Sequence, residues 1–532
     1  MSLKLGATPA ISLNLWGGCA DGSLVTGKDA VQGLTDEQKE VVLRPFPGKE
    51  SSLVVQAYAG TGKTHTLHAF ASARPKEKIH YLAFNKSMAG EAKSKFKGMR
   101  NVKVSTLHSL AYQEVGKQFK DRLGDIPLTL TVPILSKYMP HAPLYRSGSV
   151  LKRWFEDFLS SGSKGVRSYF DRNLHSRHLQ ALSDQSIEGD ALAEAVEVLW
   201  KNVIKGDGIC GPLPMPHNGY LKLYQILERQ MSSKFVLIDE AQDVTDCMIR
   251  IVSQQEAHKL FIGDSFQQIY GWNGAVDSLR KLERAGAPSL YLTKSFRCPD
   301  PVAVIANRYL DLLGAVKPFQ GNGKQDFGKG QPCILARSNA ALFKEAWNCV
   351  SNGQKPGFLG GFEGYNFNIL IDLQHAFYGK FDKVTDPWLR EEFNSFDEIL
   401  EYAEEADPQL LSRCNIVKHY RSKVKTMLFR IQKEQSRCLE EADVILSTTH
   451  KAKGAEWSEV YLCDDFVNIG DLNEKAATSE SPVTMQREDL NIMYVAVTRA
   501  KGKLDILQAQ DISDADVRSF KENLKKGRIV LL

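Results

Sequence analysis

One glycine-rich stretch restricts the folds open to this chain more than any other feature. Residues 57–64, Ala-Tyr-Ala-Gly-Thr-Gly-Lys-Thr, follow the short apolar run 53–56 and lead into a helix-compatible segment, 64–71. A strand, a glycine-rich loop and a helix in this order build a phosphate-binding loop. The stretch therefore predicts an α/β fold with a phosphate site between a strand and a helix.

The residue types of this loop suit a nucleotide. Glycines let backbone N–H groups turn toward phosphate oxygens, and the following helix adds the positive end of its dipole. We expect Lys63 to reach the β and γ phosphates of ATP and the Thr64 hydroxyl to ligate Mg²⁺. Ala57 replaces the first glycine of the usual pattern, and a chance glycine-rich turn is the alternative. The predicted nucleotide-binding residues of the loop are Ala59, Gly60, Thr61, Gly62, Lys63 and Thr64.

A second motif carries two adjacent carboxylates. The apolar run 235–238 ends in Asp239 and Glu240, as expected of a buried parallel strand that delivers acids at its carboxyl end. We expect Asp239 to hold Mg²⁺, directly or through water, and Glu240 to orient and deprotonate an attacking water. A core strand followed by a solvated acidic turn is the alternative, and the glycine-rich loop weakens it.

Length and composition bound the class of protein. The chain has 532 residues, enough for two to four domains, and its 68 Lys and Arg residues slightly exceed its 63 Asp and Glu residues. That excess permits a polyanionic partner without requiring one. Nine scattered cysteines without a C-x-x-C pair indicate reduced thiols in an intracellular protein and argue against a zinc site. No membrane span is expected, and residues 1–33 are interpreted as a lead-in rather than a signal peptide.

Two interpretations are open for Gln38, shortly before the loop. Thr35 and Gln38 have the spacing of a helix capping box. The Gln38 amide also has the donor and the acceptor needed to pair with an adenine edge. The sequence does not choose between them.

Polar and basic residues follow two further predicted strands, 78–84 and 101–106. Residues at such strand ends lie on the ligand-facing rim of an open α/β sheet and can reach phosphate oxygens. The residues concerned are Asn85, Lys86, Thr106, His108 and Ser109. The alternatives are helix caps for Thr106 and Ser109 and a structural role for His108.

The spacing of the motifs predicts two insertions. The interval between Lys63 and Asp239 is too long for the elements between two nucleotide motifs, so we expect an inserted helical domain at 112–231. Its aromatic–basic clusters, 153–155 and 167–170, are interpreted as core plus solvated face, with nucleic-acid contacts as the alternative. A second, smaller insertion is expected at 343–439.

Residues near the nucleotide motifs complete the candidate site. Gln267 follows the predicted strand 259–264 and suits a γ-phosphate sensor. Tyr270 and Trp272 come just after it, where an exposed aromatic ring stacks a base for about 1–3 kcal/mol; core packing is the alternative. Strand 289–293 is expected to begin a second sheet.

Two arginines at the ends of predicted elements suit a phosphate site. Arg297 and Arg499 lie far from the glycine-rich loop in sequence and can stabilise charge on a γ-phosphate in the transition state. A surface salt bridge is the alternative for either one.

In this order the segments resemble a superfamily 1A helicase, from residue 34 to about 508. The matching segments are Gln38, 60–64, 106–111, 239–243, 263–274, 294–299, 448–457 and 494–501. Residues 84–87, 220–223, 450–454 and 464–466 are most similar to the helicase core of the F-box DNA helicases. No F-box segment is seen ahead of the core, so ubiquitin-ligase recruitment is not expected.

The resemblance implies an α/β fold of two RecA-like P-loop NTPase domains, each with an inserted, mainly helical subdomain. The implied bounds are 34–111 with 232–288 for domain 1A, 112–231 for 1B, 289–342 with 440–532 for domain 2A, and 343–439 for a reduced 2B. ATP would lie between the domains, with Glu456 at the ribose and Arg337 near the cleft or DNA. The implied DNA contacts are Phe84, Asn85, Lys86, Thr106, His108, Ser109, Tyr270, Trp272, Thr449 and His450.

The expected function is an ATP-dependent 3′–5′ helicase acting on single-stranded DNA and junctions, in repair, recombination control or related DNA processing. Alternatives are a translocase that displaces bound proteins with little unwinding, the motor subunit of a defence or nuclease complex, and a DNA-binding scaffold switched by ATP. The pair Asp239 and Glu240, together with Arg297 and Arg499, argues against the scaffold, because a switch needs no water-activating acid.

Overall fold

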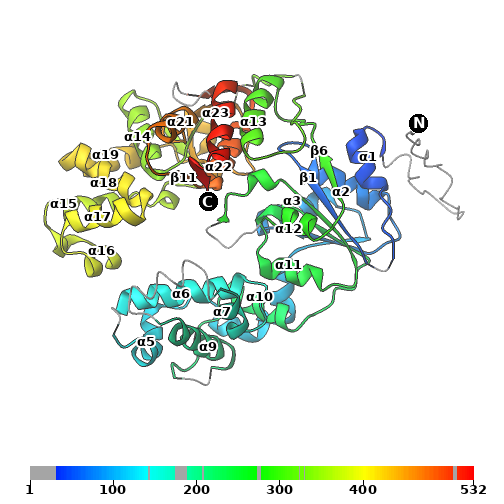
Figure 1. Ribbon diagram of the computed structural model, residues 1–532, viewed down its shortest axis with the longest axis horizontal. Helices are drawn as coiled ribbons and strands as arrows, with labels where there is room; N and C mark the ends of the chain where they lie inside the picture. Colours follow the sequence, from blue (N-terminus) through cyan, green and yellow to red (C-terminus); the bar gives the residue numbers. More distant parts are fainter. Residues whose placement is uncertain are drawn as a thin grey trace, which may run out of the picture.

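Two parallel sheets organise the chain in this computed structural model (Figure 1). It describes residues 31–48, 50–141, 144–173, 188–206, 209–271, 277–322, 324–328, 330–506 and 512–532. The first sheet has the strand order β3-β2-β4-β5-β1-β6, the second has the order β12-β10-β7-β9-β8, and every pairing in both is parallel. The predicted α/β class is confirmed, and the two sheets are consistent with two RecA-like domains.

The first sheet and its helices form what we call the first lobe. Its strands are β1 (Ser52–Ala57), β2 (Ile79–Ala83), β3 (Val102–Thr106), β4 (Phe235–Ile238), β5 (His258–Gly263) and β6 (Ser289–Leu292). Helices α1 (Asp36–Leu43), α2 (Lys63–Ser72) and α3 (Lys86–Lys95) pack on one face, and α4 (Leu107–Glu114), α11 (Asp246–Ser253) and α12 (Ser278–Arg284) pack on the other. The central strands are buried on both faces, which explains their continuous apolar runs.

The prediction that residues 289–293 begin a second sheet is wrong. β6 pairs in parallel with β1, from Ser289 opposite Val54 to Leu292 opposite Ala57. β6 is an edge strand and is only partly buried. The sequence of β6 therefore does not indicate to which of the two sheets the strand belongs.

The second sheet and the helices around it form the second lobe. Its strands are β7 (Cys333–Ala336), β8 (Pro356–Phe358), β9 (Val444–Thr448), β10 (Trp457–Leu462) and β12 (Ala500–Ile506). The helices are α13 (Asp300–Leu312), α14 (Asn339–Ser351), α20 (Thr449–Ala452), α21 (Ile469–Thr478), α22 (Arg487–Val497) and α23 (Asp514–Lys525). Strands β11 (Val483–Met485) and β13 (Ile529–Leu531) form a separate parallel pair. β8 lies inside the predicted insertion 343–439, so the sheet takes one strand from that range.

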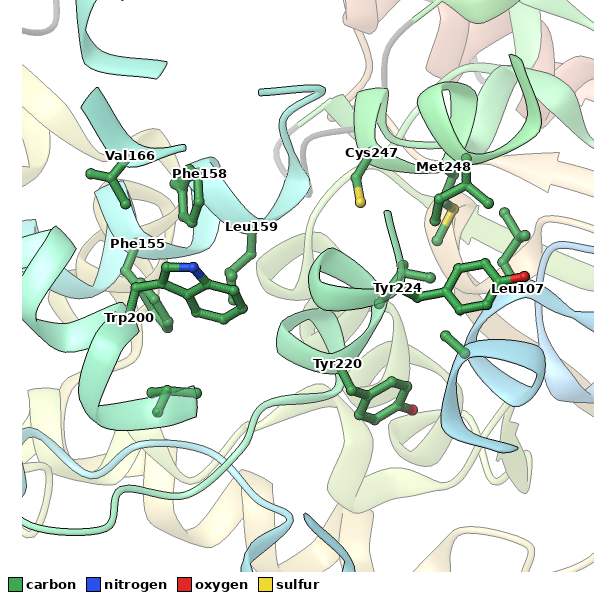
Figure 2. Packing of buried hydrophobic residues seen from close by; sticks show 14 of the residues in the cluster. Leu107, Phe155, Phe158, Leu159, Val166, Trp200, Tyr220, Tyr224, Cys247 and Met248 are labelled. Carbon is green, nitrogen blue, oxygen red and sulfur yellow. The ribbon is translucent and has the colours of Figure 1, made fainter. Parts of the chain in front are cut away.

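A group of helices between β3 and β4 matches the expectation of helical structure in 112–231. Its members are α5 (Val132–Tyr138), α6 (Leu144–Ser160), α7 (Val166–Asn173), α9 (Gly189–Lys205) and α10 (His217–Ile226). Figure 2 shows Phe155, Phe158 and Leu159 packed around Trp200, in the same buried cluster as Leu107 and Met248 of the first lobe. Arg153 and Arg167 are exposed while Trp154, Phe155 and Phe170 are buried, which confirms the core interpretation of these aromatic–basic clusters.

A second helical group lies between β8 and β9. It contains α15 (Ile369–Phe377), α16 (Pro387–Glu392), α17 (Phe396–Ala406), α18 (Pro408–Tyr420) and α19 (Val424–Glu434). These helices share a hydrophobic core with α14 and β9 of the second lobe. Within the described ranges, every helix is too short or too polar to cross a lipid bilayer. The exact domain bounds stay a prediction.

Candidate active site

The glycine-rich loop connects β1 to α2 and can be built only with glycine at two positions. Gly60 and Gly62 have φ of 68° and 80°, in the left-handed region. A Cβ atom at Gly60 would lie 2.5 Å from Arg297 Cβ, and one at Gly62 would lie 2.9 Å from Gln38 Nε2. The loop therefore lets residues from two other parts of the chain, around Gln38 and Arg297, approach its backbone closely.

The predicted lysine, threonine and acid pair meet beside this loop. Lys63 Nζ lies 3.3 Å from Glu240 Oε2, and Thr64 Oγ1 lies 3.4 Å from Asp239 Oδ2. Tyr81 of the neighbouring strand also donates its hydroxyl hydrogen to Asp239 Oδ2. Glu240 has φ of 50°, a left-handed conformation that costs a non-glycine residue on the order of 1–3 kcal/mol and that clusters at functional sites.

Asp239 and Glu240 differ in the direction in which their surroundings shift the pKa. Burial raises the pKa of Asp239, and the adjacent Glu240 raises it further. Burial acts in the same direction on Glu240, but Lys63 and Lys453 lower the pKa of that carboxyl to about 2. Glu240 is therefore ionised at neutral pH, the state in which a carboxylate can accept a proton from water.

A buried ion pair joins residues 239–243, which we call the acidic segment, to the second lobe. Lys453 Nζ lies 2.7 and 2.6 Å from the two carboxylate oxygens of Asp243 and donates to Gln267 O at 2.7 Å. Gln242 Nε2 connects Asp243 to Glu240, with contacts of 3.2 and 2.8 Å. Burial raises the pKa of Asp243 to about 6 although Lys453 opposes the shift.

Arg499 reaches the same region from just after α22. Its side chain is buried, and its Nη2 donates to Gln267 Oε1 at 3.3 Å. Gln267 Nε2 in turn donates to Asp264 Oδ2 at 2.8 Å. Burial lowers the pKa of Arg499 to about 10, so the guanidinium remains charged at neutral pH. The alternative of a surface salt bridge is wrong for this arginine.

Arg297 and Glu456 pair with each other. Arg297 Nε lies 2.6 Å from Glu456 Oε2, and Lys501 Nζ lies 3.8 Å from Glu456 Oε1. The Arg297 backbone follows the segment that packs on the loop, where Phe296 N donates to Gly60 O at 2.7 Å. Because the Glu456 side chain remains 40% exposed, the ion pair is accessible to solvent and is not part of the core.

Of the two interpretations of Gln38, the structure tests the helix cap, while adenine pairing stays a prediction. The Thr35–Gln38 capping box is present, which confirms the helix-cap interpretation. The Gln38 amide also donates to Thr61 O at 3.2 Å, so the side chain contacts the loop. Phe296, 52% exposed, lies beside it, with ring atoms 3.7 Å from where a Gly62 Cβ would be.

A groove of about 800 Å³ lies beside Asp243, at the end of the acidic segment. Six of the predicted DNA contacts line it: Phe84, Asn85, Lys86, Thr106, His108 and Ser109. Residues not predicted from the sequence also line it, among them Lys93, Tyr112, His217, Asn218 and Tyr220. The groove therefore extends from the carboxyl ends of β2 and β3 to the start of α10.

Several residues of the groove have structural roles as well. Thr106 and Ser109 form the capping box of α4, and Asn85 caps α3. His108 Nε2 lies 3.0 Å from Asn218 Oδ1, and burial lowers its pKa. The structural alternatives for Thr106, Ser109 and His108 are thus confirmed.

Four predicted DNA contacts remain: Tyr270, Trp272, Thr449 and His450. The rings of Phe84 and Tyr270 are nearly parallel, at 14°, with centroids 6.4 Å apart, and Tyr270 donates to His450 O at 3.1 Å. Thr449 is completely buried, and its hydroxyl has no hydrogen-bond partner among the described residues. Trp272 lies outside the described residues. Arg337 is held by Asp489, 3.1 Å away, in the second lobe.

Comparison with known proteins finds helicases. Residues 389–511 match the UvrD-like helicase C-terminal domain, and residues 38–273 match an AAA domain. The chain is 28% identical to F-box DNA helicase 1 of Gallus gallus over 502 residues, which are 88% of the chain and 48% of that protein. The F-box DNA helicase protein 1 of Schizosaccharomyces pombe is also 28% identical, over 89% of the chain and 57% of that protein. DNA helicase II of Escherichia coli is 23% identical over 53% of the chain and 41% of its own length.

The chain is therefore similar to UvrD-like helicases of superfamily 1: it matches their C-terminal domain, and the curated relatives it resembles are DNA helicases. It spans about half the length of the two F-box relatives. The predicted resemblance to these helicases is therefore confirmed.

Several residues at this site were not predicted from the sequence, among them Tyr81, Lys453 and Phe296. Tyr81 lies inside an apolar strand, where a tyrosine carries no signal of its partner. Lys453 and Phe296 lie inside segments matched to the family, 448–457 and 294–299, but neither residue type points to its contact. Each becomes visible only when strands or lobes are brought together.

Proposed function

We propose that the protein is an ATP-driven helicase that moves 3′ to 5′ along single-stranded DNA, inside the cell, in DNA repair, recombination control or related DNA processing. One observation carries the proposal. The Gln267 side chain of the first lobe accepts a hydrogen bond from Arg499 of the second lobe, close to the loop, Lys63 and Glu240. A nucleotide site shared between two lobes is what a motor needs, because binding and hydrolysis then change how the lobes meet.

The residues present fit ATP and Mg²⁺. The backbone of 60–64 and Lys63 would hold the phosphates, while Gln38 and the exposed ring of Phe296 would flank the base and Glu456 the ribose. Thr64 Oγ1 and Asp239 offer adjacent oxygen ligands of the kind that Mg²⁺ prefers. When bound there, Mg²⁺ would neutralise charge on the β and γ phosphates.

The chain's own groups account for hydrolysis. Ionised Glu240 would orient a water molecule and take its proton as the water oxygen attacks the γ phosphorus, releasing ADP and phosphate. Gln267 would contact the γ-phosphate, and Arg499 and Arg297 would stabilise the charge that develops there. Lys63, which pairs with Glu240 in this structure, would turn to the β and γ phosphates.

The groove supports single-stranded DNA as the polymer. Phe84 and Tyr270 are nearly parallel and 6.4 Å apart, close to about twice the ~3.4 Å spacing of stacked bases along a strand. A base between them would be held whatever its identity. Lys86 and Lys93 at the groove supply positive charge for the backbone. Direction rests on the family resemblance rather than on a contact.

Strand displacement tests the proposal. Duplexes with a 3′ or a 5′ single-stranded tail are incubated with the full chain and ATP, beside an ATPase assay with and without single-stranded DNA. We expect DNA-stimulated turnover and unwinding of the 3′-tailed duplex. Unwinding of the 5′-tailed duplex alone would contradict the direction. Stimulated turnover without unwinding would favour the protein-displacing translocase, and little turnover in either condition would favour the scaffold.

A further inference from the structure

Tyr494 lies where three parts of the chain meet. It belongs to α22 of the second lobe and is completely buried. Its hydroxyl accepts a hydrogen bond from Ala59 N–H at 3.2 Å and donates one to Asp264 Oδ2 at 3.0 Å. Ala59 belongs to the glycine-rich loop and Asp264 follows β5, so one hydroxyl joins α22 to two segments of the first lobe.

Asp264 extends this contact to the predicted γ-phosphate residues. The same Oδ2 atom accepts from Gln267 Nε2 at 2.8 Å, and Gln267 Oε1 accepts from Arg499 Nη2 at 3.3 Å. A continuous series of buried hydrogen bonds therefore runs from the loop through Tyr494 to Gln267 and Arg499.

We propose that Tyr494 is a positioning residue whose hydroxyl aligns Gln267 and Arg499 with the glycine-rich loop. The inference rests on the proposed ATP hydrolysis. Only a group that both accepts and donates can join the Ala59 N–H to the Asp264 carboxylate, and a tyrosine hydroxyl does both. Asn491 of α22 also bonds this segment, at Gln268 O, but its amide makes no contact with the loop in the hydrogen bonds of the described residues.

The loop itself has other supports. Ser295 Oγ donates to Ala59 O at 3.0 Å, Phe296 N donates to Gly60 O at 2.7 Å, and Thr61 Oγ1 donates to Tyr58 O at 2.8 Å. Loss of the Tyr494 hydroxyl would leave these bonds in place. The alignment of Gln267 would lose one of its fixed points, because Asp264 would no longer be held by α22. Nucleotide binding should therefore survive a change that slows hydrolysis.

Tyr494→Phe tests the inference, because it removes the hydroxyl and keeps the ring. Tyr365→Phe is the matched control, since that tyrosine is equally buried in the second lobe and its hydroxyl donates to Leu359 O at 2.8 Å, not to the glycine-rich loop or Asp264. Three quantities are measured on the full chain: kcat and KM for ATP with saturating single-stranded DNA, the Kd of a fluorescent ADP analogue, and the thermal unfolding midpoint.

We expect Tyr494→Phe to lower kcat by about 10- to 100-fold, as a small misplacement of reacting groups does, with KM and Kd unchanged. Both variants should lower the unfolding midpoint by a similar amount, and the control should keep the wild-type kcat. Asp264→Asn is the second variant, with the same expected split, should Tyr494→Phe not fold.

Three results would overturn the inference. The first is a wild-type kcat in a folded Tyr494→Phe protein. The second is a loss of kcat matched by weaker binding of the analogue, which would make Tyr494 a support of the loop alone. The third is the absence of turnover in the wild-type chain, which would overturn the proposed function itself.

Discussion

Lys453 and Asp243 form a buried ion pair that joins the two lobes, with Lys453 Nζ 2.6 Å from Asp243 Oδ2 and only 10% and 2% of the two side chains exposed. The pair lies between the two candidate sites. Asp243 lines the groove and contacts Gln242, whose amide also contacts Glu240, while Lys453 lies over the ring of Tyr270 at 4.9 Å. A change in how the two lobes contact each other would therefore alter both the groove and the site around Glu240.

Replacing Lys453 should destabilise the protein strongly. Lys453→Met leaves the Asp243 carboxylate buried without its cation, which typically costs about 3–5 kcal/mol. Lys521→Met is the matched control, because Lys521 pairs with Asp311 on the surface, where a pair contributes about 0–1 kcal/mol. Urea unfolding of the two variants measures both costs. Equal small losses would show that the Lys453 pair is not a buried constraint.

Glu240→Gln should separate nucleotide binding from hydrolysis. The amide keeps the shape of the side chain and removes the base, so the variant should bind ATP and fail to turn it over. Lys63→Ala should abolish turnover by removing the phosphate contact. Binding of a fluorescent nucleotide and release of phosphate are measured together. Wild-type turnover by Glu240→Gln would remove Glu240 from the role of base.

The local parts of the site could be predicted from the sequence. Gly60 and Gly62 are required by backbone geometry, and Lys63, Asp239 and Glu240 lie at the ends of strands and helices of one lobe. The positions of such residues are fixed within a few residues of a recognisable strand. The sequence pattern was therefore sufficient for them.

The contacts between lobes could not be predicted. Lys453 and Asp243 are 210 positions apart, and Tyr494 and Asp264 are 230 apart. No local pattern marks such partners, because packing of the lobes brings them together. Thr106 and Ser109 posed a different difficulty, since the hydroxyl that caps a helix is the same group that would contact a phosphate.

Stability should depend on the charge of Lys222. This side chain is completely buried, donates to Ser161 O at 2.7 Å, and has its pKa lowered by burial from 10.5 to about 8. Between these two values the unfolded chain binds more protons than the folded one, so the free energy of unfolding should rise as pH rises from about 8 to 10.5.

Lys222→Met isolates this effect from the other groups that titrate in the same range. In this variant the free energy of unfolding should lose the rise between about pH 8 and 10.5 that Lys222 contributes. At neutral pH the variant should be as stable as the wild type or more stable, because an apolar side chain needs no charge solvation. Lys201→Met, at an exposed position of α9, is the control and should keep the rise. Urea unfolding across this pH range measures it, and identical pH profiles for wild type and Lys222→Met would contradict the assignment.

The aromatic and the charged residues at the groove should respond differently to salt when DNA binds. Phe84→Ala and Tyr270→Ala should each weaken binding of single-stranded DNA by about 1–3 kcal/mol for any base sequence, because stacking does not depend on base identity. Neither ring carries charge, so the slope of log Kd against log salt should stay unchanged. Lys86→Ala should lower that slope by about 0.7, the contribution of one phosphate contact on a single strand.

Tyr270→Phe separates stacking from the other contacts of this tyrosine. It keeps the ring opposite Phe84 and removes the hydrogen bond to His450 O. If stacking is what holds the base, Tyr270→Phe should bind DNA as the wild type does while Tyr270→Ala binds weakly, in fluorescence anisotropy titrations at several salt concentrations. Equal weakening in both variants would mean that the hydroxyl matters through His450 and the second lobe, and that the ring is part of the core rather than a contact to DNA.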